Sequence, residues 1–403
     1  MEHTKVKLRE VTKVFNNKRI PLSSNQRKNK KGDFPYYGAQ GVIDNIDEYI
    51  FDGKYILIAE DGANLETRKQ PIARMTKQNE KFWVNNHAHI ITSNEKSVDE
   101  YLYYYINSID IKTHVTGSAQ PKLTKENLLN IELNLPPLEE QKRIADILTA
   151  LDDKIELNNQ MNQTLEEIAS LLYKRWFVDF EFPDDKGNPY KSSGGEMVDS
   201  ELGMIPKGWE VKKLGEIELI ITDFVSNGSF ASLKANTKIY KEENYAVFVR
   251  NTDLKSGKFE TYVDEKTYQF LSKSKLLGGE IIISNVGDVG SVFLCPRINK
   301  KMTLGNNVIL VKSQESKIYW NYYLYIFLKS SLGKALLESI TSGSAQMKFN
   351  ITDFKKLKFI APNFNTLEEF NKIFDKNIFL QNNYKAENTK LQTMKKELLK
   401  ELI

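Results

Sequence analysis

Cysteine is almost absent from this sequence. Cys295 is the only one among 403 residues, so no disulfide within the chain can form, and a reducing compartment is the natural expectation. Long apolar runs are also missing. The most hydrophobic stretch, residues 318–328, is too short to span a bilayer and contains Asn321. Residues 1–5 lack the apolar stretch of a signal peptide. We therefore expect a cytoplasmic protein that does not enter a membrane.

Patterns that carry catalytic chemistry are scarce as well. The sequence has no G-x-x-x-x-G-K-[ST] phosphate loop. The segment Asn188-Pro189-Tyr190 is like the Asn-Pro-Pro-Tyr motif of adenine methyltransferases, but it lacks the second proline and lies in a polar stretch. His87 and His89 alternate on an expected strand and could form a metal pair, yet no third ligand has matching spacing, which favours a core or surface role. We expect no enzyme, no bound cofactor and no metal site.

What the sequence does contain is a repeat of itself. Gly117-Ser118-Ala119-Gln120 recurs 226 residues later as Gly343-Ser344-Ala345-Gln346, and each copy leads into a proline and a long helical stretch. This period is far longer than the 20–50 residues of a solenoid unit, so a whole domain with its connector is duplicated. Short β-branched runs at 55–59, 89–92, 281–284 and 308–312 predict strands, and 98–109 and 318–337 predict helices.

The small net charge of +4 conceals an uneven distribution. Residues 1–135 hold 20 basic and 17 acidic side chains, and residues 201–360 hold 23 and 16, whereas residues 136–200 hold 7 and 14. Basic domains are where a nucleic-acid duplex would bind, because neutralised phosphates supply much of the affinity. A solvated, lysine-rich surface is the alternative interpretation of the same counts.

The first connector has the apolar pattern of a coiled coil. Residues at alternating steps of four and three define a heptad seam over more than four heptads: Ile144, Leu148, Leu151, Ile155, Asn158, Asn162, Leu165, Ala169, Leu172 and Trp176. Some 40 residues at ~1.5 Å each would form a rod of roughly 60 Å. The second connector is less regular, with an apolar side that includes Phe370, Phe374, Tyr384, Leu391, Met394, Leu398 and Leu402.

Both connectors place asparagines near their middle, and buried asparagines in a coiled coil fix its register. A long amphipathic helix cannot bury its stripe alone, so we expect the two to pair as an antiparallel coiled coil. Packing of each helix on its own domain is the alternative. The predicted fold is α+β, with a pseudo-two-fold repeat. Its parts are a first repeated domain (1–135), a first long helix (136–180), a linker (181–205), a second repeated domain (206–362) and a second long helix (363–403).

Several segments resemble the specificity subunit of type I restriction–modification enzymes, in the family's order and over essentially the whole chain. They are Phe34-Pro35-Tyr36-Tyr37-Gly38-Ala39-Gln40-Gly41-Val42-Ile43-Asp44, Asn86-His87-Ala88-His89-Ile90, Gly117-Ser118-Ala119-Gln120, Leu135-Pro136-Pro137-Leu138-Glu139-Glu140-Gln141-Lys142-Arg143-Ile144 and Pro206-Lys207-Gly208-Trp209-Glu210. The second copy departs from the pattern. It has Ala361-Pro362-Asn363-Phe364 without the Glu-Gln pair, and Asn306-Asn307 where the first copy was matched at His87-Ala88.

The resemblance implies a non-catalytic subunit that binds double-stranded DNA. Each recognition domain would read one half of a two-part target, and the paired helices would set the spacing. The helices would also dock two methyltransferase subunits, which use S-adenosylmethionine, and the full complex would include two restriction subunits, which use ATP.

Candidate DNA contacts are amide, guanidinium and ammonium side chains in loops. The repeated loop supplies Ser118, Gln120, Lys122, Ser344, Gln346 and Lys348, although a structural turn is an equal alternative for that loop. The basic loop of the first half supplies Lys18, Arg19, Arg27, Lys28, Lys30 and Lys31, and Asn64, Arg68, Arg250 and Asn285 complete the set.

Two other functions fit parts of the sequence. A single-chain restriction or methyltransferase enzyme would need a catalytic domain for which the repeat leaves no room. A protein scaffold built on the coiled coil would not show salt-dependent DNA binding.

Overall fold

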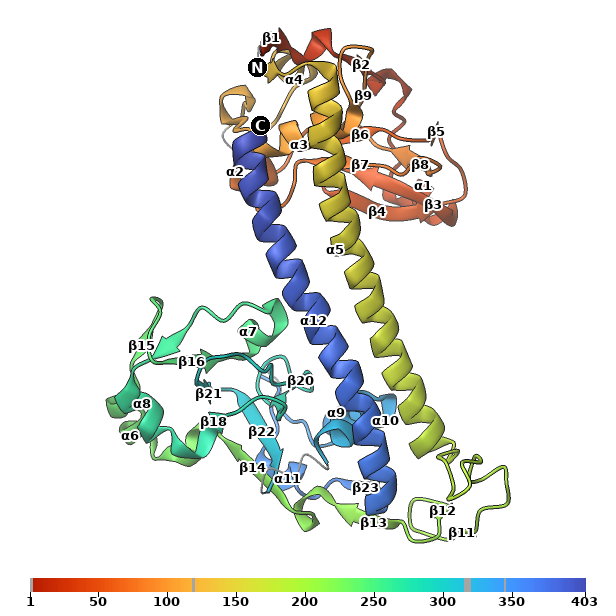
Figure 1. Ribbon diagram of the computed structural model, residues 1–403, viewed down its shortest axis with the longest axis vertical. Coiled ribbons are helices and arrows are strands. Elements are labelled where there is room, and N and C mark those ends of the chain that lie inside the picture. The colour runs from red at the N-terminus through yellow and green to blue at the C-terminus, as the bar shows by residue number, and fades with distance from the viewer. Residues whose placement is uncertain (1–2, 118–119, 315–319, 344–345) are drawn as a thin grey trace. The chain divides into compact units, whose positions relative to one another are not determined.

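The computed structural model describes residues 3–117, 120–314, 320–343 and 346–403. The chain forms two compact units: one comprises the residues up to Gln160 together with Tyr384–Ile403, and the other comprises Met161–Asn383. Two long helices, α5 (Leu138–Tyr173) and α12 (Phe364–Leu402), each contribute one segment to each unit (Figure 1). The five segment boundaries expected from sequence stay a prediction.

The first unit is built on two small sheets and a ribbon. One sheet has the order β2 (Thr12–Val14), β9 (Ala88–Ser93), β6 (Ile56–Ala59), β7 (Ala73–Met75), and the other has β4 (Gly41–Ile46), β3 (Lys31–Gly38), β8 (Lys81–Val84), β5 (Phe51–Asp52). The ribbon pairs β1 (Thr4–Lys7) with β10 (Glu132–Leu135). Only β3 and β8 run parallel among these described pairs. Strand β6, Ile-Leu-Ile-Ala, is buried on both faces, as its unbroken apolar run predicts.

Helices pack around the first unit's sheets. They are α1 (Ser24–Lys28), beside β4 of the second sheet, and α2 (Asn64–Thr67), α3 (Asp99–Ser108) and α4 (Lys125–Leu129), with the first half of α5 and the end of α12. Helix α3 packs against the first sheet through Leu102 and Ile106, which share a core with Ile56 and Ile58 of β6. Leu148 of α5 completes that core. The expected helix at 98–109 and strands at 55–59 and 89–92 are therefore confirmed to within one residue at most ends.

The second unit repeats this plan. Its main sheet has the order β14 (Leu219–Asp223), β22 (Val308–Ser313), β19 (Ile281–Ser284), β20 (Val292–Leu294). Its second sheet has β15 (Ile239–Tyr240), β17 (Tyr262–Val263), β16 (Ala246–Val249), β21 (Met302–Leu304), β18 (Lys275–Leu276), with β16 and β21 parallel. A ribbon pairs β13 (Glu210–Lys213) with β23 (Lys358–Ala361), and a short hairpin pairs β11 (Met197–Val198) with β12 (Ile205–Pro206).

Short helices and part of each long helix complete the second unit. The short helices in the described residues are α6 (Phe230–Asn236), α7 (Asn251–Ser256), α8 (Glu265–Phe270), α9 (Asn321–Lys329), α10 (Ser331–Ser339) and α11 (Ile351–Phe354). The stretch 318–337 was predicted to be helical; residues 318–319 lie outside the described residues, and the rest is helical but divided, because Ser330 separates α9 from α10. The Ser330 hydroxyl accepts a hydrogen bond from the Gly333 N–H at 3.2 Å, which caps α10.

The two units share one topology, so the internal repeat seen in the sequence is a structural repeat. Strands β2, β9, β6 and β7 correspond to β14, β22, β19 and β20, and β3 and β8 correspond to the parallel pair β16 and β21. Helix α3 corresponds to α9. The fold is α+β with two similar mixed domains, as the sequence predicts.

Within the first unit the segments of α5 and α12 pair antiparallel (Figure 1). The Asn158 side chain donates to Asn388 Oδ1 at 2.8 Å, and Asn388 donates to Asn159 Oδ1 at 2.9 Å. One to two turns away, Lys395 Nζ lies 2.6 Å from Asp152 Oδ1. Both Asn158 and Asn388 are buried, so an asparagine pair sits in the seam, where it can fix register.

Within the second unit the pairing is more apolar. Trp176, in the single π-helical turn Lys174–Val178 that ends the first rod, contacts the ring of Phe370 with centroids 6.0 Å apart. Asn377 donates to the Leu165 carbonyl at 2.9 Å. The predicted seam residues of the first rod are all buried or half-buried. They are Ile144, Leu148, Leu151, Ile155, Asn158, Asn162, Leu165, Leu172 and Trp176.

The second rod is as regular as the first, contrary to the sequence-based description. Its inward positions alternate by three and four residues: Leu367, Phe370, Phe374, Asn377, Gln381, Tyr384, Asn388, Leu391, Lys395, Leu398 and Leu402. Four of them are polar, which hid the pattern from an apolar count. Met394 was wrongly counted on this side, since it is exposed and Lys395 takes the seam position.

Candidate nucleic-acid interface

The basic loop of the first unit is mostly ion-paired. Arg27 Nε lies 3.2 Å from Asp44, which also binds Lys31, and Lys30 Nζ lies 2.6 Å from Glu48. Arg19 is held by Glu60. Lys18 and Lys28 are exposed and form no ion pair with the described residues. These two ammonium groups are therefore the ones that the loop leaves available to a phosphate.

The other four candidate DNA contacts, Asn64, Arg68, Arg250 and Asn285, all form hydrogen bonds within their own unit. The Asn64 side chain exchanges hydrogen bonds with the backbone of Gln70, and Arg68 donates to the carbonyls of Asn107 and Ile109. Arg250 binds Asp253 through Nε and Nη2 at 3.0 and 2.7 Å, and the same carboxylate accepts the Arg250 backbone N–H at 3.0 Å at the start of α7. Asn285 donates weakly to the Phe349 carbonyl, at 3.3 Å. Their role in DNA binding stays a prediction.

The repeated Gly-Ser-Ala-Gln loops are partly described. Ser118 and Ser344 lie outside the described residues. Gln120 and Gln346 are exposed and bind no described residue through their side chains. The stems correspond closely: the Lys122 N–H donates to the Thr116 carbonyl at 2.7 Å, and the Lys348 N–H donates to Ser342 at 2.9 Å. The loops thus have a structural turn at their base, with amide and ammonium groups above it.

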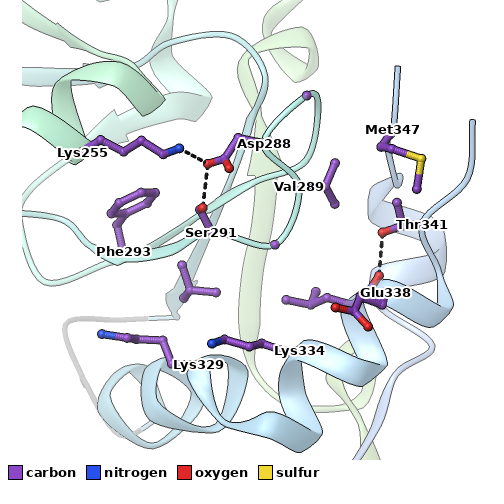
Figure 2. A pocket seen from close by; sticks show the side chains of 14 residues that line it. Lys255, Asp288, Val289, Ser291, Phe293, Lys329, Lys334, Glu338, Thr341 and Met347 are labelled. Carbon is purple, nitrogen blue, oxygen red and sulfur yellow. Dashed lines mark hydrogen bonds and ion pairs between the residues drawn. The ribbon is translucent and has the colours of Figure 1, made fainter. Parts of the chain in front are cut away.

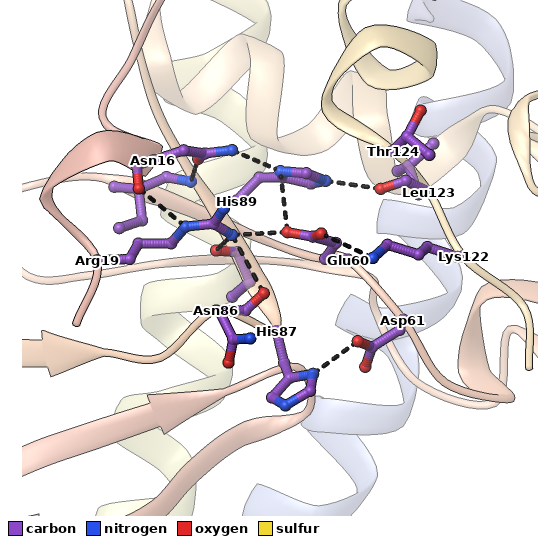
Figure 3. A network of polar contacts seen from close by, with 12 residues as sticks. Asn16, Arg19, Glu60, Asp61, Asn86, His87, His89, Lys122, Leu123 and Thr124 are labelled. Carbon is purple, nitrogen blue, oxygen red and sulfur yellow. Dashed lines mark hydrogen bonds and ion pairs between the residues drawn. The ribbon is translucent and has the colours of Figure 1, made fainter. Parts of the chain in front are cut away.

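In the first unit this stem borders a network of charged groups (Figure 3). The Glu60 carboxylate receives Arg19 Nη1 at 2.6 Å and lies 3.4 Å from Lys122 Nζ and 3.6 Å from His89 Nδ1. Burial raises the pKa of the Glu60 carboxyl, but the hydrogen bond and charge of Arg19, with His89 and Lys122, outweigh that effect. The pKa therefore lies below its ordinary value. Glu60 is an anion that orders three basic groups around it.

The two expected strand histidines have different surroundings. His89 is fully buried, with Nε2 2.7 Å from the Leu123 carbonyl and Nδ1 2.8 Å from the Asn16 amide. Burial lowers its pKa below the ordinary histidine value. His87 precedes β9, is exposed, and its Nδ1 lies 2.6 Å from Asp61 Oδ2 (Figure 3). Among the described residues no cluster of three or more metal-binding side chains occurs.

The second unit has a cavity of mixed charge beside its repeated loop (Figure 2). The cavity, about 660 Å³, is lined by Lys255, Lys329 and Lys334, by Asp288 and Glu338 and by Met347. Lys255 is bound to Asp288 at 2.5 Å, and Lys329 Nζ lies 3.1 Å from the Tyr325 hydroxyl. Lys334 of α10 is exposed and forms no ion pair in the described part of the chain. Lys334 is thus the lining lysine that the described residues leave exposed and without a hydrogen-bond partner.

Two equivalent exposed turns were not among the DNA contacts predicted from the sequence. Residues Asn86 and His87 are exposed between buried β8 and β9, and Asn306 and Asn307 are exposed between β21 and β22. The Glu60 N–H donates to the His87 carbonyl and the Asn285 N–H to that of Asn307, so His87 matches Asn307, not Asn306. The sequence signal that could have indicated these turns is a pair of polar residues between two apolar strands.

Comparison with known proteins identifies the architecture. The sequence model of the family described as type I restriction modification DNA specificity domain matches residues 2–167 and 206–395. The chain belongs to this family. It is a specificity subunit of a type I restriction–modification system, with one family domain in each half.

Relatives of this family match most of the chain. A putative type I restriction enzyme specificity subunit of Haemophilus influenzae is 27% identical over 92% of this chain and 86% of its own length. The specificity subunit of the type I restriction enzyme MjaIX of Methanocaldococcus jannaschii is 28% identical over 82% of this chain and 74% of its own. A similar fold occurs in the crystal structure of the type I system S subunit from M. genitalium. Its TM-score is 0.62 and its identity 14%, over 100% of this chain and 96% of that one.

Among the described residues, no helix is both long and apolar enough to cross a membrane.

Proposed function

We propose that this specificity subunit reads a two-part target in double-stranded DNA, with one recognition domain on each half. The repeat carries the proposal, because the same topology presents different exposed side chains at the same turn, Asn86-His87 in one unit and Asn306-Asn307 in the other. A shared scaffold with different surface groups is what two different half-sites require. The net positive charge of both domains supports binding to phosphate.

The long helices are proposed to bind two modification subunits, one against each domain. In the second unit, α5 exposes a heptad-spaced apolar stripe of Met161, Ile168 and Leu171, separate from its buried seam. Helix α12 exposes Ile373 and Leu380, seven residues apart. Exposed apolar stripes on paired helices are typical of protein interfaces. Two restriction subunits would join the full complex.

The chain itself is proposed to be non-catalytic and cytoplasmic. The modification subunits would bind S-adenosylmethionine, and the restriction subunits would use ATP. Purification with the modification subunits should therefore give DNA methylation at a stoichiometry of one specificity chain to two modification chains. A preparation of this chain alone that methylates DNA would contradict the proposal.

Domain exchange tests the reading of separate half-sites. Replacing residues 1–135 by the equivalent domain of a relative should change one half of the methylated target and leave the other half intact, because each unit has its own core. The measurement is methylation mapping of genomic DNA. A change in both halves would show that the domains do not read independently.

A seven-residue insertion tests whether the helices set the spacing. Placed between Asn159 and Gln160 it keeps the heptad phase and adds about 10 Å of helix. The accepted gap should lengthen by up to roughly three base pairs, at ~3.4 Å of rise each, while both half-sites stay the same. A compensating insertion in α12 beside Asn388 maintains the pairing. An unchanged gap with full activity would show that the helices do not determine it.

A further inference from the structure

The turn between β21 and β22 borders a cavity that differs from its counterpart in the first unit. In the first unit, Arg19 fills the equivalent space: its guanidinium donates to Glu60 and to the carbonyls of Asn86 and Ala88 (Figure 3). In the second unit the residue equivalent to Glu60 is Asn285. There the space is an open cavity of about 500 Å³, without an arginine among its lining residues.

The walls of this cavity are apolar and exposed. Phe230, at the start of α6, is 81% exposed, Val225 is 59% exposed and Ile239 is 54% exposed, and Phe224 and Val308 lie deeper. Apolar side chains gathered around a cavity on a protein surface mark a binding site rather than ordinary surface.

The floor and rim of the cavity are polar. Asn306 and Asn307 are exposed, and their side-chain amides bind no described residue. Asn285 Oδ1 is shielded from solvent and has no hydrogen-bond partner among the described residues. Carboxamide groups with free donors and acceptors are suited to the edge of a base, and above all to adenine N6 and N7.

Ammonium groups outnumber unpaired carboxylates around the cavity. Its lining holds Lys234 and one carboxylate, Asp223, which accepts hydrogen bonds from the Ser226 N–H and hydroxyl. Residues 224–241 add Lys238 and Lys241; Glu242 and Glu243 follow them, and Glu243 is bound to Lys300. None of Lys234, Lys238 and Lys241 forms an ion pair within the described residues. This charge favours a polyanion over an apolar protein segment as the occupant.

We infer that this cavity reads one A·T base pair of the second half-site. The thymine C5-methyl group enters between Phe230, Val225 and Ile239, and the side chain of Asn306 or Asn307 pairs with the adenine edge. The inference rests on the proposed function of the chain in reading DNA. It assigns specificity at one base-pair position to the cavity. The first domain should make no such methyl contact, because Arg19 occupies the equivalent space there.

Deoxyuridine substitution tests the methyl contact, because deoxyuridine keeps the pairing of thymine and lacks its methyl group. The complex with the cognate modification subunits is titrated with duplexes in which each thymine of the second half-site is replaced in turn. At one position affinity should fall about fourfold, the effect of burying one methyl-sized group. In the Phe230→Ala complex the same replacement should have no further effect.

Leu277→Ala is the matched control, since Leu277 is 82% exposed in the same unit and does not line the cavity. It should keep the full methyl dependence. Both variants alter exposed side chains, so the folded unit should persist. An unaltered methyl dependence in Phe230→Ala, or a second half-site without an A·T pair, would overturn the inference. So would a loss of assembly with the modification subunits in Phe230→Ala, which would make the cavity a protein-docking surface.

The amide contact has its own test. Replacing the paired adenine by 7-deazaadenine removes N7, and affinity should fall roughly tenfold. The double variant Asn306→Ala with Asn307→Gly should remove that sensitivity; glycine keeps the left-handed conformation of Asn307, whose φ is 62°. Undiminished sensitivity in the double variant would overturn this assignment. Failure of the proposed function appears differently, as a wild-type complex with no sequence preference in its methylation.

Discussion

The same place in the two repeated domains is built in opposite ways. In the first domain Arg19, Glu60, His89 and Lys122 form a network of charges around one carboxylate. In the second, Asn285 replaces the carboxylate and the space is an apolar cavity. The backbone hydrogen bonds around both are equivalent. One scaffold therefore accommodates either a charged network or an apolar cavity at the position where the strands end.

The largest effect is expected from Arg19→Met in the first domain. The Arg19 and Glu60 side chains are mostly buried, so removing Arg19 takes away the hydrogen-bonded cation and leaves the carboxylate with the half-exposed Lys122 as its remaining ammonium partner. The change should cost up to roughly 3–5 kcal/mol of unfolding free energy in that unit. Hydrogen exchange of the β6 and β9 amides measures it. Lys18→Met, on an exposed neighbour, should change stability by less than about 0.5 kcal/mol. Equal effects of the two would mean that Arg19 has no structural role.

A second contrast lies in the helix pairing: in the first unit two asparagines meet across the seam, and in the second unit Trp176 packs on Phe370. Asn158→Leu strands the buried Asn388 Oδ1 and should cost about 1–3 kcal/mol. Asn158→Leu combined with Asn388→Leu should recover much of that loss, because both polar groups are then gone. Denaturant unfolding followed by exchange of the α5 amides gives both values. A double variant less stable than either single one would contradict the pairing.

A smaller effect should appear as pH falls. The pKa of His89 in the folded state lies below its ordinary value, so the folded state binds fewer protons than the unfolded state. The stability that neutral His89 contributes is therefore present above about pH 6.5 and is lost as pH falls toward the folded pKa. Glu60 acts in the same direction at lower pH, since its pKa is also lowered and its contribution is lost as pH falls below about 4.3. One proton changes stability by at most about 1.4 kcal/mol per pH unit.

His89→Leu supplies the control, because Ile309 holds the corresponding position in the second unit. The variant should flatten the pH dependence of exchange in β6 between about pH 6.5 and the folded pKa, although it is less stable throughout. The second unit should not respond. An unchanged slope in the variant would show that His89 does not titrate on unfolding.

The smallest effect concerns DNA affinity. Lys28→Met removes an exposed, unpaired ammonium group and should lower the salt dependence of binding by about 0.9 in log–log slope if it contacts one phosphate. Lys30→Met, whose side chain is bound to Glu48, should change the slope less. The assay is titration of the assembled complex over a range of salt concentrations. A larger change in Lys30→Met would reverse the ranking that ion pairing suggests.

Much of the fold was visible in the sequence. The repeat, the strands at 281–284 and 308–312 and both long helices follow from local patterns, because burial on one face or both imposes a period. The candidate contacts were less visible. Arg19, Arg27 and Lys31 look alike as basic loop residues, yet their partners Glu60 and Asp44 lie far along the chain. Polar seam residues such as Gln381 and Lys395 were missed because an apolar count excludes them.

By itself the sequence determined the family, the duplication and the long amphipathic helices, since these depend on residue identity and local spacing. Only the tertiary structure decided which charged side chains form ion pairs and which asparagines meet across the helix seam. It also decided that Phe230, Asn285 and Asn307 border one cavity. Those facts depend on strands and loops that are distant in sequence. A side chain's availability to DNA is set by the neighbours that folding brings to it, and no local pattern records them.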